Sequence, residues 1–181
     1  MANTVSRAMH DAGLAAWFGG TLANAVALNP AAAEAGDDSS TGRVANAGWD
    51  RWTPVNAGAI GVHLIGAIGQ LVGNKSRVAA QEGVASMTVT KTVLTAAALG
   101  ATAYSRVLGK KVSQYDDVPA DSGTAPVSST PDDAASAQKQ LAILQWLIPA
   151  LTGALVLTAS YAGEQQRATE VHKGIAARLM S

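Results

Sequence analysis

The stretch WTPVNAGAIGVHLIGAIGQLVGN, residues 52–74, decides the fold class. It contains no Asp, Glu, Lys or Arg, and its few polar side chains stand among Ala, Val, Leu, Ile and Gly. A helix of about 20 predominantly apolar residues is long enough to cross the hydrocarbon core of a bilayer. The stretch therefore predicts a membrane span over residues 55–72, with a histidine at its centre.

Three further segments share this apolar character, and none of them contains an acidic residue. The four predicted spans cover residues 12–33, 55–72, 88–108 and 141–163. In the third span, Lys91 and Arg106 stand near the two ends, where long basic side chains reach the interface. We therefore predict an all-α protein, an integral membrane four-helix bundle that forms one domain over residues 1–181.

Composition distinguishes this prediction from a soluble bundle of Ala-rich helices. Only 14% of the residues are charged, whereas soluble domains have about 25%. A soluble bundle helix also needs a charged face at the helical period, and residues 55–72 and 141–163 have none. A second alternative is a signal peptide that ends near AAAEA, residues 31–35. Because the first apolar run is longer than a usual signal sequence, we predict a retained first helix.

The connections between the spans are of two kinds. The first and third are acidic and rich in Ser and Asp, and the third is predicted to be a mobile loop over residues 112–138. The tail after residue 163 is predicted to continue as an amphipathic helix. Lys and Arg divide almost evenly between the two sides, so they do not decide the orientation. We predict a multi-pass plasma-membrane protein with both termini in the cytoplasm, because loops rich in Ser, Pro and Asp are readily translocated.

Two rows of polar or aromatic side chains repeat every seven residues along predicted helices. They are Asn56, His63 and Gln70 in one row, and His10, Trp17 and Asn24 in the other. Residues seven apart lie along one helix face. An ionisable side chain inside a span is a functional candidate, and histidine changes its charge near neutral pH. The competing interpretation is that Asn, Gln and neutral His join helices by hydrogen bonds.

The functional interpretation of these rows is a binding pocket for a quinone or a haem. Its residues would be His63, Asn24, Gln70 and Trp17. A haem held by two histidines would need a partner subunit, because His10 stands outside the predicted spans. The sequence contains no cysteine, which excludes disulfides and thiolate metal sites. It also lacks every catalytic and metal-binding motif that we sought, so we predict no catalytic and no metal-binding residue.

Glycines indicate close helix contact in the second span. Gly61, Gly69 and Gly73 fall on one helix face, and the last two form a small-xxx-small pair. Such faces let a second helix approach closely, within the chain or in another subunit. The function predicted first is therefore a structural or accessory subunit. It would pack in the lipid bilayer against other membrane proteins or further copies of itself, as in a respiratory or electron-transfer assembly.

Two other functions stay open. One is a small membrane oxidoreductase, or a quinone- or haem-binding protein, that uses His63. The other is a small-solute transporter, which the lack of an acidic residue within a span disfavours. Enzymatic activity is undecided, and the lack of a catalytic motif disfavours it. Nucleic acid is excluded as a partner, because the net charge is zero and no basic face with aromatic side chains exists.

The quoted stretch also carries a resemblance. WDRWTPVNAGAIGVHLIGAIGQL, residues 49–71, and ATAYSRVLGKK, residues 101–111, resemble small four-span membrane proteins of high-GC actinobacteria. HDAGLAAWFGGTLANAVALNPAA, residues 10–32, resembles their first span. This resemblance covers most of the chain except the third loop, and it implies the four-span fold without an activity. A looser similarity to DoxX-like and anthrone-oxygenase-like four-helix membrane proteins rests on the number of spans and one membrane histidine.

Overall fold

The computed structural model describes residues 2–80, 83–115 and 117–164, and over these ranges the chain is almost entirely helical. The predicted all-α class is therefore confirmed. The long helices are α1 (Ala2–Ala23), α3 (Asp38–Gly73), α5 (Val84–Val112) and α6 (Asp132–Glu164). Short elements join them: η1 (Asn24–Leu28), α2 (Asn29–Ala32), η2 (Ala33–Ala35), α4 (Lys75–Ala80), β1 (Ala120–Ser122) and β2 (Ala125–Pro126).

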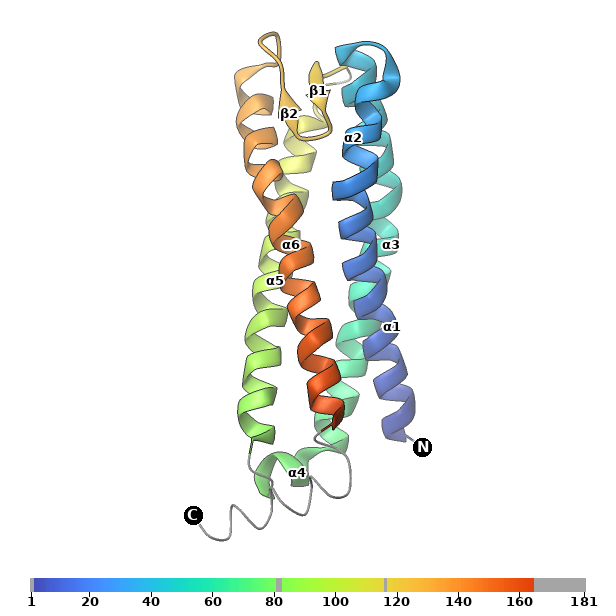
Figure 1. Cartoon of the computed structure of the whole chain (residues 1–181), viewed down its shortest axis with the longest axis vertical. Helices are drawn as coiled ribbons and strands as arrows, with labels where there is room; N and C mark the ends of the chain where they lie inside the picture. The colour runs from blue at the N-terminus through green and yellow to red at the C-terminus, as the bar shows by residue number, and fades with distance from the viewer. Residues whose placement is uncertain (1, 81–82, 116, 165–181) are drawn as a thin grey trace.

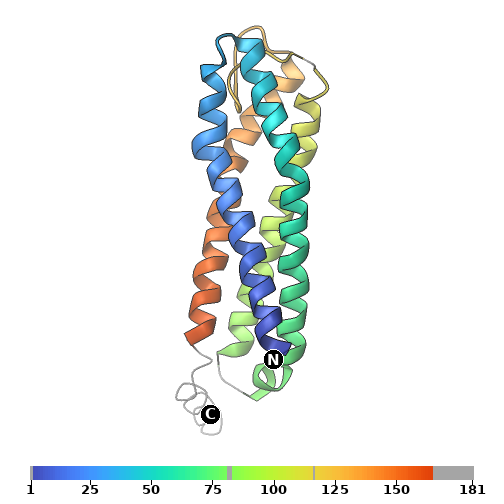
Figure 2. The same ribbon diagram turned by 90° about the vertical axis from the view of Figure 1, so that its right-hand side faces the viewer.

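The long helices form two antiparallel pairs that stand side by side (Figures 1 and 2). One pair is α1 with α3 and the other is α5 with α6. The pairs meet mainly where α1 packs against α6, while α3 and α5 make almost no direct contact. We call the end with the antiparallel hairpin of β1 and β2 the upper end, and the end with α4 the lower end. The bundle is thus packed on three sides and open between α3 and α5.

Glycines let α1 and α3 approach each other backbone to backbone. A Cβ atom added to Gly13 would lie 2.5 Å from the carbonyl oxygen of Ala59. A Cβ atom added to Gly66 would lie 2.6 Å from the carbonyl oxygen of Ser6. Neither position has room for a side chain, so this pair depends on the smallest residue on both helices.

The start of α3 is fixed by its own sequence rather than by packing. Gly36 adopts a left-handed conformation with φ 98°, which ends the preceding turn. Asp37 then caps α3, because its carboxylate accepts a hydrogen bond from the backbone N–H of Ser40 at 2.9 Å. This bond, together with one from the Ser40 hydroxyl, lowers the pKa of Asp37. The helix therefore begins well before the apolar stretch and continues through Pro54 into it.

Three of the long helices, α3, α5 and α6, are long and apolar enough to cross a membrane. Their large apolar side chains point outward to an unusual degree for a bundle. The outward-facing ones include Val55, Val62, Ile65 and Val72 on α3, Val89, Val93 and Val107 on α5, and Ile143, Trp146, Val156 and Leu157 on α6. Such broad exposed apolar surface is typical of helices that contact lipid or another protein.

The first predicted span is not among these helices, so the four-span prediction is not confirmed as it was made. Residues 12–33 do not form one uninterrupted α-helix, because α1 gives way to the π-helical turn η1 at Asn24. The first half of α1 also holds Arg7, His10 and Asp11, which lower its mean hydropathy. The α1 helix nevertheless runs along the whole lower part of α3 (Figure 1).

The segment predicted as a mobile loop, residues 112–138, is largely folded. It contains the hairpin of β1 and β2, and Val118 and Ala120 are buried against the bundle. The helix α6 begins at Asp132, inside the predicted loop. The acidic first turn of α6 favours a helix start. The sequence did not indicate that Val118 and Ala120 are buried, because the segment is polar on average. The predicted amphipathic helix after residue 164 lies outside the described residues.

Candidate functional site

His63 lies fully buried in the contact between α3 and α1. Its Nδ1 atom is 3.1 Å from the backbone carbonyl oxygen of His10. A carbonyl only accepts, so Nδ1 bears the hydrogen and Nε2 is an acceptor. That Nε2 atom is buried and has no partner among the residues that the structure describes. The bond joins α3 to α1, as the helix-joining interpretation of this histidine requires.

His10, which the sequence placed outside the spans, lies against His63. The two ring centroids are 4.4 Å apart, and His10 Nδ1 donates to the Asp11 carboxylate at 2.8 Å. An iron between two imidazoles would separate the centroids by two metal–nitrogen bonds of about 2 Å, plus the distance from each nitrogen to its ring centre. The pair as it stands is too close to hold a haem iron between its rings.

The four residues predicted to form one pocket do not come together. Trp17 is buried and meets His63 edge to face, with centroids 6.0 Å apart. Gln70 stands seven residues after His63, about 10 Å along the axis of α3, and lines a different space. Asn24 stands about as far above Trp17 and is half-buried. Only His63 and Trp17 therefore belong to one cluster.

The open side of the bundle is a groove between α3 and α5 with two cavities. The upper cavity has a volume of about 280 Å³, and the lower one has about 380 Å³. Leu99 lines both, so the two cavities are adjacent along the groove. Their walls are mostly apolar, with a few polar groups, which is the usual character of small-molecule sites.

Two residues that line the upper cavity each have a buried side-chain atom without a hydrogen-bond partner in the described part of the chain. These atoms are the indole Nε1 of Trp52 and the side-chain oxygen of Asn56, both on α3. Asn56 is 8% exposed, so its amide is almost completely removed from solvent. An unpaired buried polar group costs about 1–3 kcal/mol. A group that supplied the missing partner would therefore be stabilised here.

Neighbouring residues hold these groups in place. The ring of Trp52 packs over Gly20 of α1, where an added Cβ atom would lie 2.7 Å from Cε2 of the indole. On the opposite wall, the hydroxyl of Thr102 accepts a hydrogen bond from Nε1 of Trp17 at 3.3 Å. Thr102 thus links the buried cluster of Trp17 and His63 to the cavity, which His63 itself does not line.

The upper rim of the groove is closed by polar contacts. Arg106 of α5 donates to the carboxylate of Asp50 of α3 at 3.1 Å, across the groove. Beside it, a fully paired network joins α2, α3, α6 and the hairpin: Trp49 Nε1 to Asn29 at 2.9 Å, Asn29 to Gln145 at 2.8 Å, and Gln145 to Thr124 at 3.0 Å. These bonds fix the upper end, so the cavity beneath them has a defined shape.

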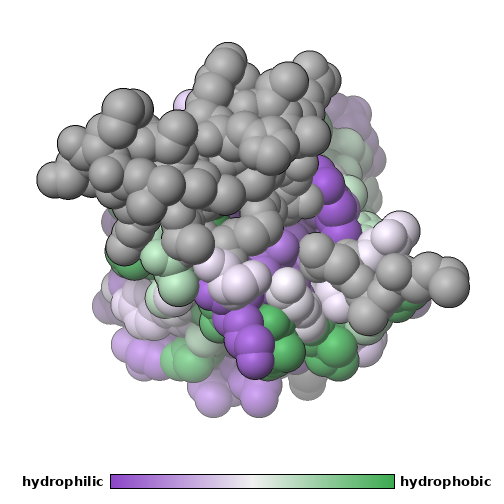
Figure 3. Space-filling view, turned by 90° about the horizontal axis from the view of Figure 1, so that it is seen from below, coloured by the Kyte–Doolittle hydropathy of each residue, from purple (hydrophilic) through white to green (hydrophobic). Residues whose placement is uncertain are grey.

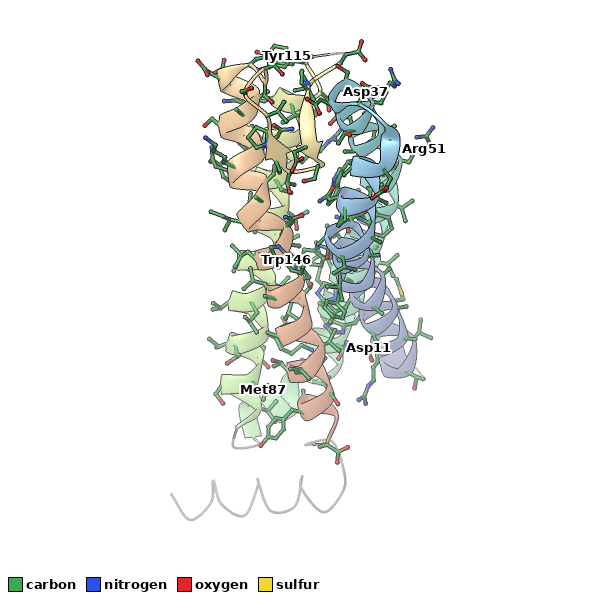
Figure 4. All side chains as sticks on the ribbon, turned by 45° about the horizontal axis from the view of Figure 1, so that its top comes forward. Asp11, Asp37, Arg51, Met87, Tyr115 and Trp146 are labelled. Atoms are coloured by element: carbon green, nitrogen blue, oxygen red, sulfur yellow. The ribbon has the colours of Figure 1, made fainter. Side chains whose placement is uncertain are left out.

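The lower cavity presents a different set of polar groups. It is lined by Lys91 of α5 and by Gln70 of α3, whose Nε2 atom is buried without an acceptor among the described residues. The rest of its wall consists of apolar and uncharged polar side chains. Figure 4 shows Met87, another lining residue, near the lower end of α5.

The glycines predicted to pack against a helix divide between two faces. Gly69 lies against Ser6 of α1, so it contributes to the contact of α1 with α3. A Cβ atom added to Gly61 would have no atom of the described residues within 4 Å, apart from its own helix and its chain neighbours. A contact of Gly61 with a partner helix stays a prediction. Gly73 is the last residue of α3.

Sequence reasoning named Asn56 in its polar row but did not propose it for the site. Trp52 was not predicted to belong to the site. The two residues are four apart, a spacing that brings side chains together on one helix face. That spacing was a signal for the site. Thr102 gave no such signal, because its role depends on Trp17 from another helix.

Comparisons with known proteins add no further assignment. No protein-family model matches this chain, and no curated protein and no solved structure matches it significantly. The resemblance to small four-span membrane proteins therefore stays a prediction.

Proposed function

We propose that the chain is an integral membrane protein in which α1, α3, α5 and α6 all cross the bilayer. The outward-facing apolar side chains of α3, α5 and α6 support this, as does the length of these helices. The α1 helix would cross with them because it packs along α3 and α6 and buries His10, while its exposed charged residues, Arg7 and Asp11, stand in its lower half. The start of α1 and the end of α6 both lie at the lower end of the bundle. They would therefore lie on the same side of the plasma membrane, and we assign that side to the cytoplasm.

The function that the geometry supports best is the binding of a lipid-soluble molecule in the upper cavity. The observation that supports it most is that Trp52 and Asn56, two residues that line this mostly apolar cavity, each have a buried side-chain atom without a partner among the described residues. A molecule dissolved in the membrane would reach this cavity through the open side between α3 and α5. Binding of this kind needs no catalytic residue.

The polar groups of the cavity define the chemistry of the ligand. The indole of Trp52 only donates, and the hydroxyl of Thr102 also has a hydrogen to donate. The amide of Asn56 presents an acceptor or a donor, because its oxygen and nitrogen are assigned from their surroundings. A ring carbonyl accepts from Trp52 and Thr102, whereas the unpaired oxygen of Asn56 needs a donor, which the ring hydroxyl of a reduced quinone supplies. A quinone with an apolar tail is therefore the ligand class that we propose, bound by Trp52 and Asn56 instead of His63.

A second function, the accessory subunit predicted from the sequence, is favoured by the glycines around the groove. Among the described residues, no atom lies within 4 Å of a Cβ atom added to Gly61 or to Gly109, apart from their own helices and chain neighbours. Gly109 lines the upper cavity directly. A helix of another membrane protein, such as a subunit of an electron-transfer complex, would approach closely at such positions. This partner would occupy the groove in place of a small ligand.

Quinone titration of the detergent-purified protein tests the first proposal. Quenching of tryptophan fluorescence by a short-chain naphthoquinone should saturate. Replacing Asn56 with Leu should weaken the affinity about tenfold, the effect of about 1.4 kcal/mol. A second variant, Trp52→Phe, removes the indole N–H from the cavity wall. Its matched control is Trp146→Phe, because Trp146 lies exposed on α6 (Figure 4). Equal affinity in the wild type and in Asn56→Leu would contradict the proposal.

The accessory-subunit function makes a different prediction for the same groove. A partner helix in the groove would be cross-linked by a photoreactive residue at position 61 but not by one at position 65, where Ile65 points outward. Cross-linking at both positions, or at neither, would argue against this second function. Saturable quinone binding together with no cross-link at position 61 would favour the first.

A further inference from the structure

The lower cavity contains a basic side chain that the proposed quinone site does not use. We propose that this cavity binds the anionic head of a membrane phospholipid, with Lys91 as the counter-ion and the amide of Gln70 as a second donor. The proposal rests on the residence of the protein in a membrane and is independent of any ligand in the upper cavity. It assigns a lipid to the lower half of the groove between α3 and α5.

Lys91 is a half-buried cation without a paired carboxylate. No hydrogen bond or ion pair joins its ammonium group to another described residue. The carboxylate of Asp11 of α1 acts on Lys91 electrostatically, and it is already engaged by Arg7 at 3.8 Å and by His10 at 2.8 Å.

Gln70 provides an independent observation on the opposite wall. Its Nε2 atom is buried and has no acceptor within the described ranges, and an amide nitrogen only donates. Among the described residues, no acidic side chain lines the cavity. The hydroxyls of Thr88 and Thr92 donate to backbone carbonyls of their own helix at 2.8 Å each. The cavity is thus lined by a cation and by an amide whose nitrogen lacks an acceptor.

The position of the cavity matches the depth of a lipid head. Gln70 lies in the last turn of α3 and Lys91 lies about 10 Å from the start of α5, both near the lower end. Figure 3 looks onto this end, where hydrophilic residues lie beside hydrophobic ones. Basic pockets between membrane helices on the cytoplasmic side are typical sites for anionic lipid heads.

The apolar wall above the two donors suits acyl chains. Ile68 and Leu71 of α3 line the lower cavity, as does Leu99 of α5. Leu99 also borders the upper cavity, so the chains of a lipid would run upward along the groove. A phosphodiester has several acceptor oxygens and accepts from Lys91 and Gln70 together, and the surrounding membrane supplies it in excess. A free fatty acid has the same charge and one chain, and the test below separates the two.

Native mass spectrometry of the full chain in detergent tests this proposal. The protein is exposed to phosphatidylglycerol, to phosphatidylcholine with the same acyl chains, or to oleate. We expect retained phosphatidylglycerol at one molecule per chain and at least fivefold less of either other compound. Replacing Lys91 with Met should reduce retained phosphatidylglycerol at least fivefold. The matched control is Lys75→Met, because Lys75 is an exposed cation at the same end of the bundle.

Two further variants keep the test informative if Lys91→Met folds poorly. Lys91→Arg preserves the charge and should retain phosphatidylglycerol, whereas Gln70→Glu places an anion in the cavity and should expel it. Equal retention in Lys91→Met and in the wild type would overturn the proposal, as would a preference for phosphatidylcholine or for oleate. Quinone quenching measured on the same samples reports on the upper cavity separately, so the failure of one site is distinguishable from the failure of the other.

Discussion

His63 is the residue for which sequence and structure give the clearest comparison. Its spacing from Asn56 and Gln70 predicted an inward-facing polar row on one helix. All three side chains have a buried polar atom that lacks a partner in the described part of the chain. The partner of His63 Nδ1 was not predictable, because it is a backbone carbonyl of α1 that no side-chain pattern reveals.

Truncation of His63 should therefore affect stability and leave ligand binding intact. His63→Ala removes a hydrogen bond and leaves a cavity between α1 and α3, which should lower the free energy of unfolding by about 2–4 kcal/mol. Reversible unfolding in mixed micelles measures this change. The affinity for naphthoquinone should stay within about twofold of the wild type, since His63 does not line the upper cavity.

Asn56→Ala serves as the matched variant, two turns away on the same helix. It should show the opposite pattern, with weakened ligand binding and nearly unchanged stability. If His63→Ala instead abolished binding while the fold persisted, His63 would be a ligand contact and the site would be misplaced.

At the scale of the elements, the contact between α1 and α3 depends on glycines that the sequence only partly indicated. The pattern of small residues in α3 predicted close contact and named Gly61, Gly69 and Gly73. The closest approach is at Gly66 and at Gly13 of α1. When a helix has glycine on several faces, its sequence does not show which face contacts the neighbouring helix, because that depends on tertiary packing.

Adding one methyl group at Gly66 should therefore be costly. Gly66→Ala places a Cβ atom on the backbone of His10 and Ser6, and the forced separation of the helices should cost about 1–3 kcal/mol. Gly58→Ala is the matched control on the same helix, where a Cβ atom meets nothing within 4 Å. The control should be neutral or stabilising by up to about 1 kcal/mol, since alanine favours the helix. Equal effects of the two substitutions in unfolding experiments would contradict the close contact.

The first span and the third connection were likewise predictable only in part. The acidic, Ser-rich composition of the third connection correctly excluded a further long apolar helix there. It did not predict that Val118 and Ala120 would be buried, because two apolar residues barely change the average of a polar segment. The interruption of the first span at Asn24 was equally hidden, since a π-helical turn has no sequence signature in this stretch.

At the scale of the whole molecule, the composition was enough to predict the helical class and the apolar helices. Both follow from averages over many residues. The pairing of α1 with α3 and of α5 with α6 was not predictable, because it depends on which faces meet. The open side, where the proposed sites lie, follows from that pairing. The site that we propose therefore lies at Asn56 and Trp52, and the site predicted around His63 stays a prediction.

Disulfide trapping tests the open side directly, because the chain has no native cysteine. A double cysteine variant at Ser6 and Gly69 should oxidise readily, since an added Cβ atom at Gly69 would lie 2.9 Å from Cβ of Ser6. A pair at Ile60 and Leu99, on opposite walls of the groove, should oxidise far more slowly, because α3 and α5 make almost no direct contact and a disulfide needs closely spaced Cα atoms. Mobility shifts on non-reducing gels measure both. Rapid bridging of the second pair in membranes would show that the groove closes.

If the upper cavity binds a lipid-soluble molecule through Trp52 and Asn56, as we propose, that molecule should accompany the purified protein. The most direct measurement is mass analysis of the organic extract from protein purified out of its own membranes. The wild type and the Trp146→Phe control should each release one carbonyl-bearing, lipid-soluble compound in near-equimolar amount. Asn56→Leu, folded to the same extent, should release at least fivefold less. Equal amounts from all three proteins, or no such compound from the wild type, would contradict the claim.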